Sequence, residues 1–315
     1  MTKKERVLKA IRFDTPDRIP VWHFNCDEPA GDILRYELAL ETDCRSEWGY
    51  RWVRMGDGTM GQPSGPVIPR WDDLRDFRFP ELRAEERLMG IHGFRSRSEG
   101  HYLLAGMGIT GFTTYTFLRG FENAMVDFVL ETGRAEALLD GIFSFECNLM
   151  TLAAQAGFDG IHFQDDWGTQ DSLIIDPVLW RRLFAPRYRE QFALAHRLGL
   201  HVWFHSCGKI TAIFEDMHNL GVDVMNISQP NVVDTAAVGV TLRGRQCFMA
   251  PISYQTVSLT GTREEIFAEA RRLYSDLGTA RGGFIGYVEE YGSIGMPPEN
   301  YRACIEAFGA LEDLT

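Results

Sequence analysis

Apolar positions along the chain follow two patterns. Short, nearly continuous apolar runs alternate with longer segments in which hydrophobic residues recur every three or four positions. The short runs predict strands at residues 19–24, 102–107, 160–165, 201–205, 223–227, 246–250 and 283–288. The longer segments predict helices at residues 3–13, 121–131, 134–156, 177–184, 186–198, 210–220, 232–239, 263–277 and 298–311.

The order of these segments indicates the fold class. Strands separated by helices of about ten residues or more pair in parallel, because a parallel connection needs a crossover. The strands are apolar on both faces, which is typical of a sheet covered on both sides. Roughly seven or eight such units predict a (βα)₈ barrel, a TIM-type α/β fold, in a single domain over residues 1–315. A doubly wound sheet is the alternative, but no Gly-x-Gly-x-x-Gly turn follows an early strand.

One segment interrupts the alternation. Residues 47–79 are rich in aromatic residues, glycine and proline, and they contain the turn sequence Gly56-Asp57-Gly58. Turn residues of this kind between apolar runs favour a β-hairpin. We therefore expect an excursion from the barrel here, built around a hairpin.

Charge and composition narrow the class of protein. A net charge of −12 and a pI of about 5.2 argue against a nucleic-acid partner, which needs a basic surface. The stretch closest to a membrane span, residues 135–156, carries Glu136, Asp140 and Glu146, and it predicts a helix packed in the core. No secretion signal is evident, so we expect a cytoplasmic protein without a membrane partner. Its six cysteines lack the spacing of a disulfide scaffold.

Catalytic groups of a (βα)₈ barrel gather where strands end and the following loops begin. The predicted strand ends are unusually polar here: they carry His23, Asn25, Gln164, Asp165, Asp166, His205, Ser206, Cys207, Asn226, Ser228, Gln229, Glu289 and Glu290. The candidate catalytic residues are Asp165, Asp166 and Asn226. The candidate cofactor-binding residues are His23, Gln164 and Gln229.

The sharpest motif is the His-Ser-Cys-Gly sequence at residues 205–208. Side chains alternate between the faces of a strand, so His205 and Cys207 project the same way. A neutral imidazole and a thiolate held together are good ligands for Zn²⁺. The candidates for a third ligand are Glu290, Glu289, Asp165 and Asp166. The alternative interpretation is a chance His-x-Cys pair whose histidine is only hydrogen-bonded.

Two adjacent carboxylates follow the preceding strand, in the sequence FQDDWGTQ at residues 163–170. Asp165 and Asp166 would repel each other if both were buried and ionised. On a strand they face opposite sides, so one can enter the site while the other caps or pairs elsewhere. The alternative is that Asp166 or Thr169 only organises a loop.

A series of sequence blocks carries a family resemblance along nearly the whole chain. In chain order they are RVLKAIRFDTPDRIPVW, EWG, DGTMGQP, WDDL, DDWGTQ, FHSCGKI, GVDVMNISQP, GGFI and MPPENYRA. With these blocks the chain resembles the uroporphyrinogen decarboxylase superfamily, and within it the branch that includes zinc-dependent corrinoid methyltransferases. The resemblance implies a (βα)₈ barrel.

The chain departs from the true decarboxylases of that superfamily. In those enzymes an arginine-containing segment after the first strand holds the acidic side chains of the substrate. Here residues 23–29 read His-Phe-Asn-Cys-Asp-Glu-Pro, with two acids and no arginine. This segment would repel a substrate that carries many carboxylates. We therefore do not expect uroporphyrinogen decarboxylation.

The methyltransferase branch implies a zinc held by a His-x-Cys pair and a later third ligand. His205 and Cys207 match the pair, and the later ligand falls at or beside Glu290, where the family carries cysteine or histidine. Zinc accepts glutamate in catalytic sites. The resemblance thus implies His205, Cys207 and Glu290 as metal ligands.

The expected function is a zinc-dependent methyltransferase. It would move a methyl group between a corrinoid carried by a separate protein and a thiol or similar small acceptor. One alternative is a decarboxylase or other lyase that acts on a smaller substrate. Another is a non-catalytic binding subunit of a corrinoid pathway. A small-molecule substrate, a corrinoid-binding partner protein and a homodimer are the expected partners.

Overall fold

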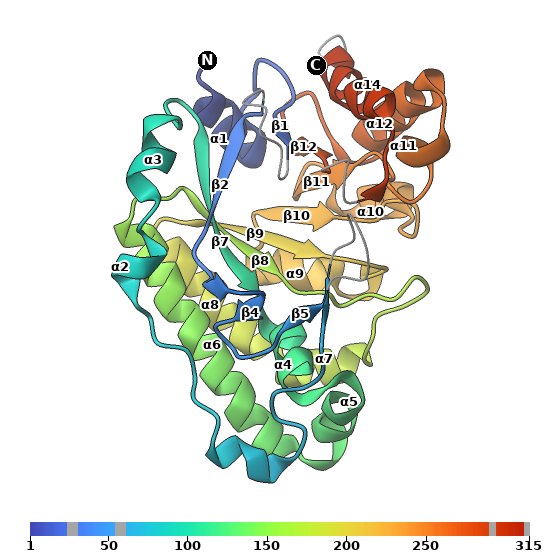
Figure 1. The fold of residues 1–315 in the computed structure, drawn as a ribbon. Coiled ribbons are helices and arrows are strands. Elements are labelled where there is room, and N and C mark those ends of the chain that lie inside the picture. The colour runs from blue at the N-terminus through green and yellow to red at the C-terminus, as the bar shows by residue number, and fades with distance from the viewer. Residues whose placement is uncertain (24–30, 54–60, 290–293, 312–315) are drawn as a thin grey trace.

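The computed structural model describes residues 1–23, 31–53, 61–289 and 294–311. Eight parallel strands form a nearly closed barrel (Figure 1). They are β1 (Val21–His23), β2 (Ile33–Glu37), β7 (Tyr102–Ile109), β8 (Gly160–Gln164), β9 (His201–Ser206), β10 (Val224–Ile227), β11 (Cys247–Pro251) and β12 (Phe284–Val288). Their order in the sheet is β1-β12-β11-β10-β9-β8-β7-β2. The predicted (βα)₈ fold is confirmed.

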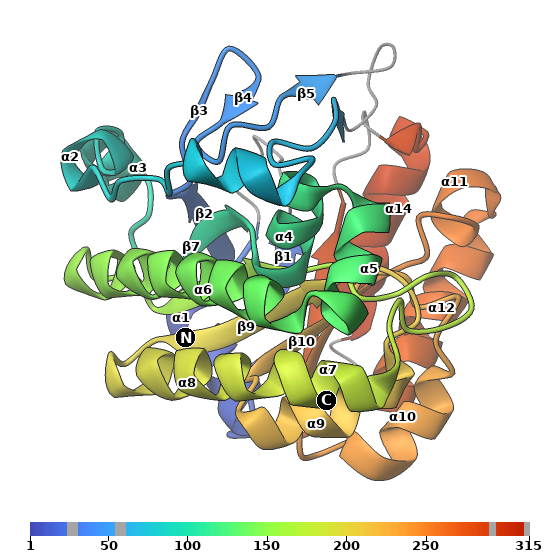
Figure 2. The same cartoon turned by 90° about the horizontal axis from the view of Figure 1, so that it is seen from below.

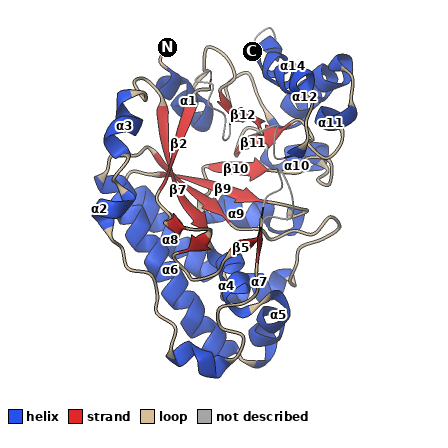
Figure 3. Ribbon diagram, viewed as in Figure 1, coloured by secondary structure: helices blue, strands red, loops and turns tan. Residues whose placement is uncertain are grey.

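Helices surround the barrel in Figures 2 and 3. Those before β8 are α1 (Lys3–Arg12), α2 (Ala84–Arg87), α3 (Ile91–Ser96), α4 (Gly111–Arg119), α5 (Phe121–Leu130) and α6 (Thr132–Gln155). Those after it are α7 (Pro177–Leu183), α8 (Ala185–Arg197), α9 (Phe214–Leu220), α10 (Thr235–Leu242), α11 (Val257–Thr260), α12 (Arg263–Leu277) and α14 (Pro298–Gly309). The described residues also form the 3₁₀ turns η1 (Trp71–Arg75) and η2 (Thr211–Ile213).

Helix α1 covers the end of the barrel where the strands begin. A capping box of Thr2 and Glu5 starts the helix. Val7 and Ile11 on its buried face belong to the same apolar cluster as Trp22 and Trp203 of the barrel interior. This end of the barrel is therefore filled, and the opposite end, where the strands finish, is left for chemistry.

The excursion contains the expected hairpin. Strands β5 (Trp52–Val53) and β6 (Gln62–Pro63) pair antiparallel, and their connection, residues 54–60 with the Gly56-Asp57-Gly58 turn, lies outside the described residues. A second antiparallel pair precedes it, formed by β3 (Glu41–Thr42) and β4 (Arg45–Ser46). The rings of Trp52, Tyr50 and Phe117 pack edge to face, which fixes the excursion against α4.

Among the described residues, α6 alone is long and apolar enough to cross a membrane, judged by length and composition. Its most apolar window is 56% buried inside the structure. The helix packs against α4, α5 and α8. This is the packing expected of a helix in the core of the fold.

Candidate metal centre at the barrel mouth

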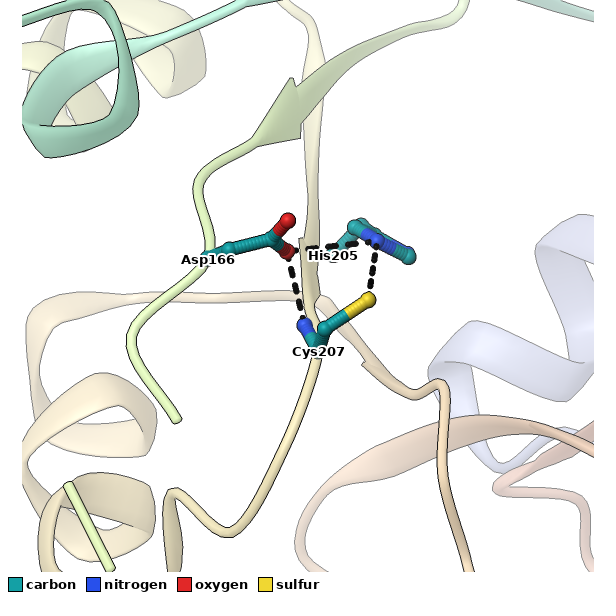
Figure 4. A group of neighbouring side chains, drawn as sticks. All are labelled: Asp166, His205 and Cys207. Atoms are coloured by element: carbon teal, nitrogen blue, oxygen red, sulfur yellow. Dashed lines mark hydrogen bonds and ion pairs between the residues drawn. The ribbon is translucent and has the colours of Figure 1, made fainter. Parts of the chain in front are cut away.

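Three side chains of metal-ligating type meet where β8 and β9 end (Figure 4). His205 Nε2 lies 3.6 Å from Cys207 Sγ and 3.6 Å from Asp166 Oδ1. The candidate ligand atoms all lie within 4.8 Å of one another. A tetrahedral zinc with bonds of about 2.0–2.3 Å separates a nitrogen and a sulfur ligand by about 3.5 Å. The donor set and its spacing therefore fit a zinc ion.

Strand geometry explains how these three side chains meet. His205 lies in β9, and Cys207 follows two positions later, just beyond the strand end. Asp166 approaches from the segment after β8, as Figure 4 shows. The Cys207 backbone N–H donates to Asp166 Oδ1 at 2.8 Å, which holds the carboxylate beside the other two groups.

The segments after β8 and β9 continue to pair beyond the strands. The backbone N–H of Gly168 donates to the Cys207 carbonyl at 3.1 Å, and that of Lys209 donates to the Thr169 carbonyl at 2.8 Å. The two segments are in closest contact at their glycines: a Cβ on Gly168 would lie 2.5 Å from the carbonyl carbon of Gly208. The two segments that carry the cluster are therefore hydrogen-bonded to each other and closely packed.

Asn226 of β10 orients the imidazole of His205. Its Nδ2 donates to the Met249 carbonyl at 3.0 Å, so its Oδ1 is left to accept from His205 Nδ1 at 2.6 Å. When the imidazole is neutral, its proton therefore lies on Nδ1, and the lone pair of Nε2 faces Cys207 and Asp166, as a metal ligand requires. Burial acts to lower the pKa of His205, but the hydrogen bond and charge of Cys207, with Asp166 and Asn226, raise it to about 9.

Two hydroxyl groups border the sulfur of Cys207. Ser228, which is 2% exposed, places its Oγ 3.8 Å from Cys207 Sγ. The Tyr254 hydroxyl lies 2.8 Å from Ser228 Oγ. Burial, and then the charge of Cys207, raise the pKa of Tyr254, so its hydroxyl keeps its proton at neutral pH.

Asp165 has a separate place from Asp166. Its buried carboxylate accepts from the backbone N–H groups of Phe112 and Thr113 at 3.0 and 2.8 Å, and also from the Tyr188 hydroxyl. These contacts cap the start of α4. Burial raises the pKa of Asp165 to about 7 despite these hydrogen bonds. Asp166 therefore lies in the cluster, whereas Asp165 lies at the start of helix α4.

The two glutamines expected to bind a cofactor lie on either side of the cluster. Gln164 of β8 accepts from Arg35 Nη2 at 2.6 Å, and Arg35 also pairs with Glu37 at 2.5 Å. Gln229 accepts from the Gly208 backbone N–H at 2.8 Å. Gln164 therefore faces the barrel interior, whereas Gln229 supports the turn after Cys207.

The remaining predicted site residues lie on β1 and after β12. His23 ends β1 and is 8% exposed. Glu289 follows β12, and its Oε2 accepts from the Tyr287 hydroxyl at 2.7 Å. Glu290, the expected third metal ligand, lies outside the described residues. Among the described candidates for that role, the acid that reaches the His-Cys pair is Asp166.

Two residues of the mouth escaped the sequence analysis, and a third was noted without a role. Arg35 belongs to β2, a strand that the apolar pattern did not predict. Tyr254 lies in the loop after β11, far from Cys207 in sequence, and no sequence pattern indicates that the two residues are close. Ser228 was noted only as a polar strand end. The alignment of Asn226 with His205 across the β9–β10 ladder is what brings Ser228 beside Cys207.

The excursion borders the mouth. A cavity of about 160 Å³ lies between it and the ends of β7 and β8. Trp48 and Tyr50 of the excursion line this cavity, together with Glu37, Ile109 and Gln164 of the barrel. Gln164 also pairs with His205 in the β8–β9 ladder. The excursion therefore forms one wall of the space next to the cluster.

Comparisons with known proteins place this site in context. The family model described as Uroporphyrinogen decarboxylase (URO-D) matches residues 52–311. The fold is similar to a methyltransferase from Methanosarcina mazei, with a TM-score of 0.76, 16% identity and 99% of both chains covered. A D-psicose 3-epimerase structure aligns with a TM-score of only 0.47 and 10% identity, over 90% of this chain and 89% of that one. No curated protein matches the chain in sequence.

Proposed function

The chain belongs to the uroporphyrinogen decarboxylase family, and we propose that within it the protein is a zinc-dependent methyltransferase. The observation that carries this proposal is the nitrogen, sulfur and oxygen donor set of His205, Cys207 and Asp166 at the barrel mouth. The fold shared with a methyltransferase is compatible with it. The methyl group would come from a corrinoid on a separate protein and pass to a thiol or similar small acceptor.

The chain's own residues prepare this site for a metal and an acceptor. His205, Cys207 and Asp166 would hold the zinc, which would supply a Lewis acid that keeps an acceptor thiol deprotonated at neutral pH. Three protein ligands leave a fourth position for the acceptor, as in catalytic zinc sites. Asn226 fixes the imidazole orientation, and the Cys207 backbone N–H holds the carboxylate.

A metal measurement tests the proposal. Protein purified without chelator should carry about one zinc per chain by elemental analysis. Cys207→Ser and Asp166→Asn should lower zinc affinity at retained fold, because each weakens a ligand. Asp171→Asn, an exposed acid of the same β8 loop, is the matched control and should keep the metal. Methyl transfer from methylcobalamin to a small thiol should stop when a chelator removes the zinc.

Arg35 favours a second candidate, a lyase that acts on a small carboxylate. Its guanidinium lies inside the barrel mouth beside Gln164, where it could pair with a substrate acid. Turnover of a carboxylate substrate that survives complete zinc removal would support this candidate and contradict the methyltransferase. Zinc binding together with a corrinoid protein, but without any methyl transfer, would instead indicate a binding subunit.

A further inference from the structure

The surroundings of Cys207 raise a question of selectivity. In the proposed reaction an acceptor thiolate attacks an electrophilic methyl group beside the cluster. Cys207 would present a second thiolate to the same methyl group. A thiolate is the reactive form of cysteine. Methylation of Cys207 would cost the site a ligand, so the site needs a means of making this sulfur the poorer nucleophile.

Two hydroxyl groups form a hydrogen-bonded chain that begins at that sulfur. Ser228 Oγ lies 3.8 Å from Cys207 Sγ and is buried, so its hydroxyl has few other partners to choose. The Tyr254 hydroxyl lies 2.8 Å from Ser228 Oγ. As a thiol, Cys207 donates its S–H to Ser228 Oγ. As a thiolate the sulfur can only accept, so the Ser228 hydroxyl donates to it and accepts in turn from the Tyr254 hydroxyl. Ser228 and Tyr254 thus form a relay of two hydroxyls that ends on Cys207.

Each member of the relay is held in place by the fold. Ser228 directly follows β10. It lies beside Cys207, because Asn226 pairs with His205 in the ladder between the parallel strands β9 and β10. Tyr254 lies in the turn after β11, whose Ser253 backbone N–H donates to Glu269 at 3.1 Å. The relay therefore belongs to the ordered wall of the mouth.

We propose that Ser228 and Tyr254 are positioning residues that hold the Cys207 sulfur and reduce its nucleophilicity, so that a methyl group passes to the acceptor and Cys207 stays unmethylated. This role rests on the proposed function for its purpose, but the contacts among Cys207, Ser228 and Tyr254 exist without the metal. A hydrogen bond to a thiolate stabilises its charge. A stabilised thiolate is the weaker nucleophile, by about threefold for each tenfold gain in its stabilisation, since the Brønsted coefficient is about 0.4–0.5.

Alkylation of Cys207 by methyl iodide tests the relay. The thiolate forms a bond to the methyl carbon, the carbon–iodine bond breaks, and iodide leaves with the electron pair. Mass spectrometry of the Cys207 peptide reads the product, separately from the other cysteines. The rate is taken on zinc-loaded protein, and on metal-free protein at the high-pH plateau, where the thiol is fully ionised. The first rate reports the nucleophilicity of the zinc-bound sulfur, and the second reports that of the free thiolate.

Ser228→Ala should raise the Cys207 alkylation rate by about threefold or more. Tyr254→Phe, which keeps the ring and removes only the second hydroxyl, should raise it by less. Ser228→Thr keeps a hydroxyl and should return the wild-type rate. Tyr274→Phe is the matched control, because it removes a buried hydroxyl that has no hydrogen-bond partner among the described residues.

Equal plateau rates in the wild type, Ser228→Ala and Tyr254→Phe would overturn the relay. That outcome differs from failure of the proposed function. A protein that binds no zinc would contradict the methyltransferase, yet the metal-free plateau rates would still decide whether the two hydroxyls restrain Cys207. Faster alkylation in Ser228→Ala, with wild-type rates in Ser228→Thr, supports the relay in either case.

Discussion

At the residue scale, the amide of Asn226 determines which nitrogen of His205 faces the cluster. Replacing Asn226 by alanine removes the acceptor for Nδ1–H, so the imidazole can turn or change tautomer. Loss of such an orienting partner weakens metal affinity by about 10–100-fold. We therefore expect Asn226→Ala to bind zinc about 10–100-fold more weakly than wild type in competition with a chromophoric chelator.

Asn231→Ala is the control for this measurement. Asn231 lies in the following loop and bonds to Gln255 at an exposed position. It should keep wild-type zinc affinity. Equal affinity in Asn226→Ala and wild type would remove Asn226 from the support of the metal centre.

Glu146 of α6 makes stability depend on pH. Burial raises the pKa of this carboxyl to about 8, even though it accepts from the Gly111 backbone N–H and from Gln191, both at 2.7 Å. Between its ordinary pKa and about 8, the folded protein keeps a proton that the unfolded chain releases. Stability contributed by the neutral acid is therefore lost as pH rises through this window.

Glu146→Gln should remove this part of the pH dependence. The glutamine can accept from Gly111, and its amide N–H can donate to Gln191 Oε1, a buried atom without a hydrogen-bond partner among the described residues. Urea unfolding from pH 5 to 9 should show the wild type losing stability relative to Glu146→Gln as pH rises. Glu136→Gln, on the exposed side of the same helix, should follow the wild type. Parallel curves for wild type and Glu146→Gln would contradict the assignment.

The alternation of side chains along a strand predicted much of the arrangement of the site residues. It placed His205 and Cys207 on one side and separated Asp165 from Asp166, and the structure has both arrangements. It could not identify Tyr254, because the loop that carries Tyr254 approaches Cys207 only in the folded barrel and no sequence periodicity relates the two residues. Nor could it show which of Asp165 and Asp166 lies in the cluster. That choice depends on the N–H groups of α4, a helix that the apolar pattern did not reveal.

At the scale of elements, the cluster depends on the contact between the segments after β8 and β9. A Cβ on Gly208 would overlap the carbonyl group of Gly168, and Gly208 has a positive φ of 75°. Gly208→Ala should therefore destabilise the fold by at least about 1–2 kcal/mol, the cost of the left-handed conformation alone. It should also weaken zinc binding, since separating the segments moves Asp166 away from Cys207.

Gly199→Ala separates these two effects. Gly199 has a similar φ of 80°, but a Cβ there meets nothing within 4 Å. It should lower stability in urea unfolding by the conformational cost and leave zinc affinity unchanged. Zinc affinity that falls equally in both variants would show that the contact between the two segments does not position the cluster.

The elements that the sequence missed share a physical cause. Strand β2 reads ILRYE, and its Arg35 and Glu37 interrupt the apolar run because they face the polar mouth of the barrel. Only residues 24–32 separate it from β1, a stretch shorter than the helices of about ten residues on which the predicted β/α alternation rests, so the alternation does not predict this strand. Helix α4 is polar and rich in threonine, and it is stabilised by tertiary capping at Asp165 more than by helix propensity.

At the scale of the whole molecule, the barrel closes where β1 and β2 meet, and a buried carboxylate holds this seam. No strand ladder joins the two in the described part of the chain, but Asp32 N–H donates to the Val21 carbonyl at 2.8 Å. The Asp32 side chain, fully buried, accepts from Arg6 Nη1 at 2.6 Å, from Arg18 at 2.9 Å and from Val21 N–H at 2.9 Å. It thereby joins helix α1, the loop before β1, and both strands.

Asp32→Asn should therefore loosen the barrel as a whole. Removing one partner of a buried ion pair costs about 3–5 kcal/mol. The lower end of this range applies here, because Arg6 keeps its pair with Asp17 and Arg18 is partly exposed to water. Urea unfolding should show a loss of about 3 kcal/mol in a single transition, with hydrogen exchange accelerated in α1, β1 and β2 together. Asp216→Asn, which breaks the exposed pair with Arg181, should change stability little. A small effect of Asp32→Asn would mean that apolar packing between α1 and the barrel interior closes the seam without the ion pairs.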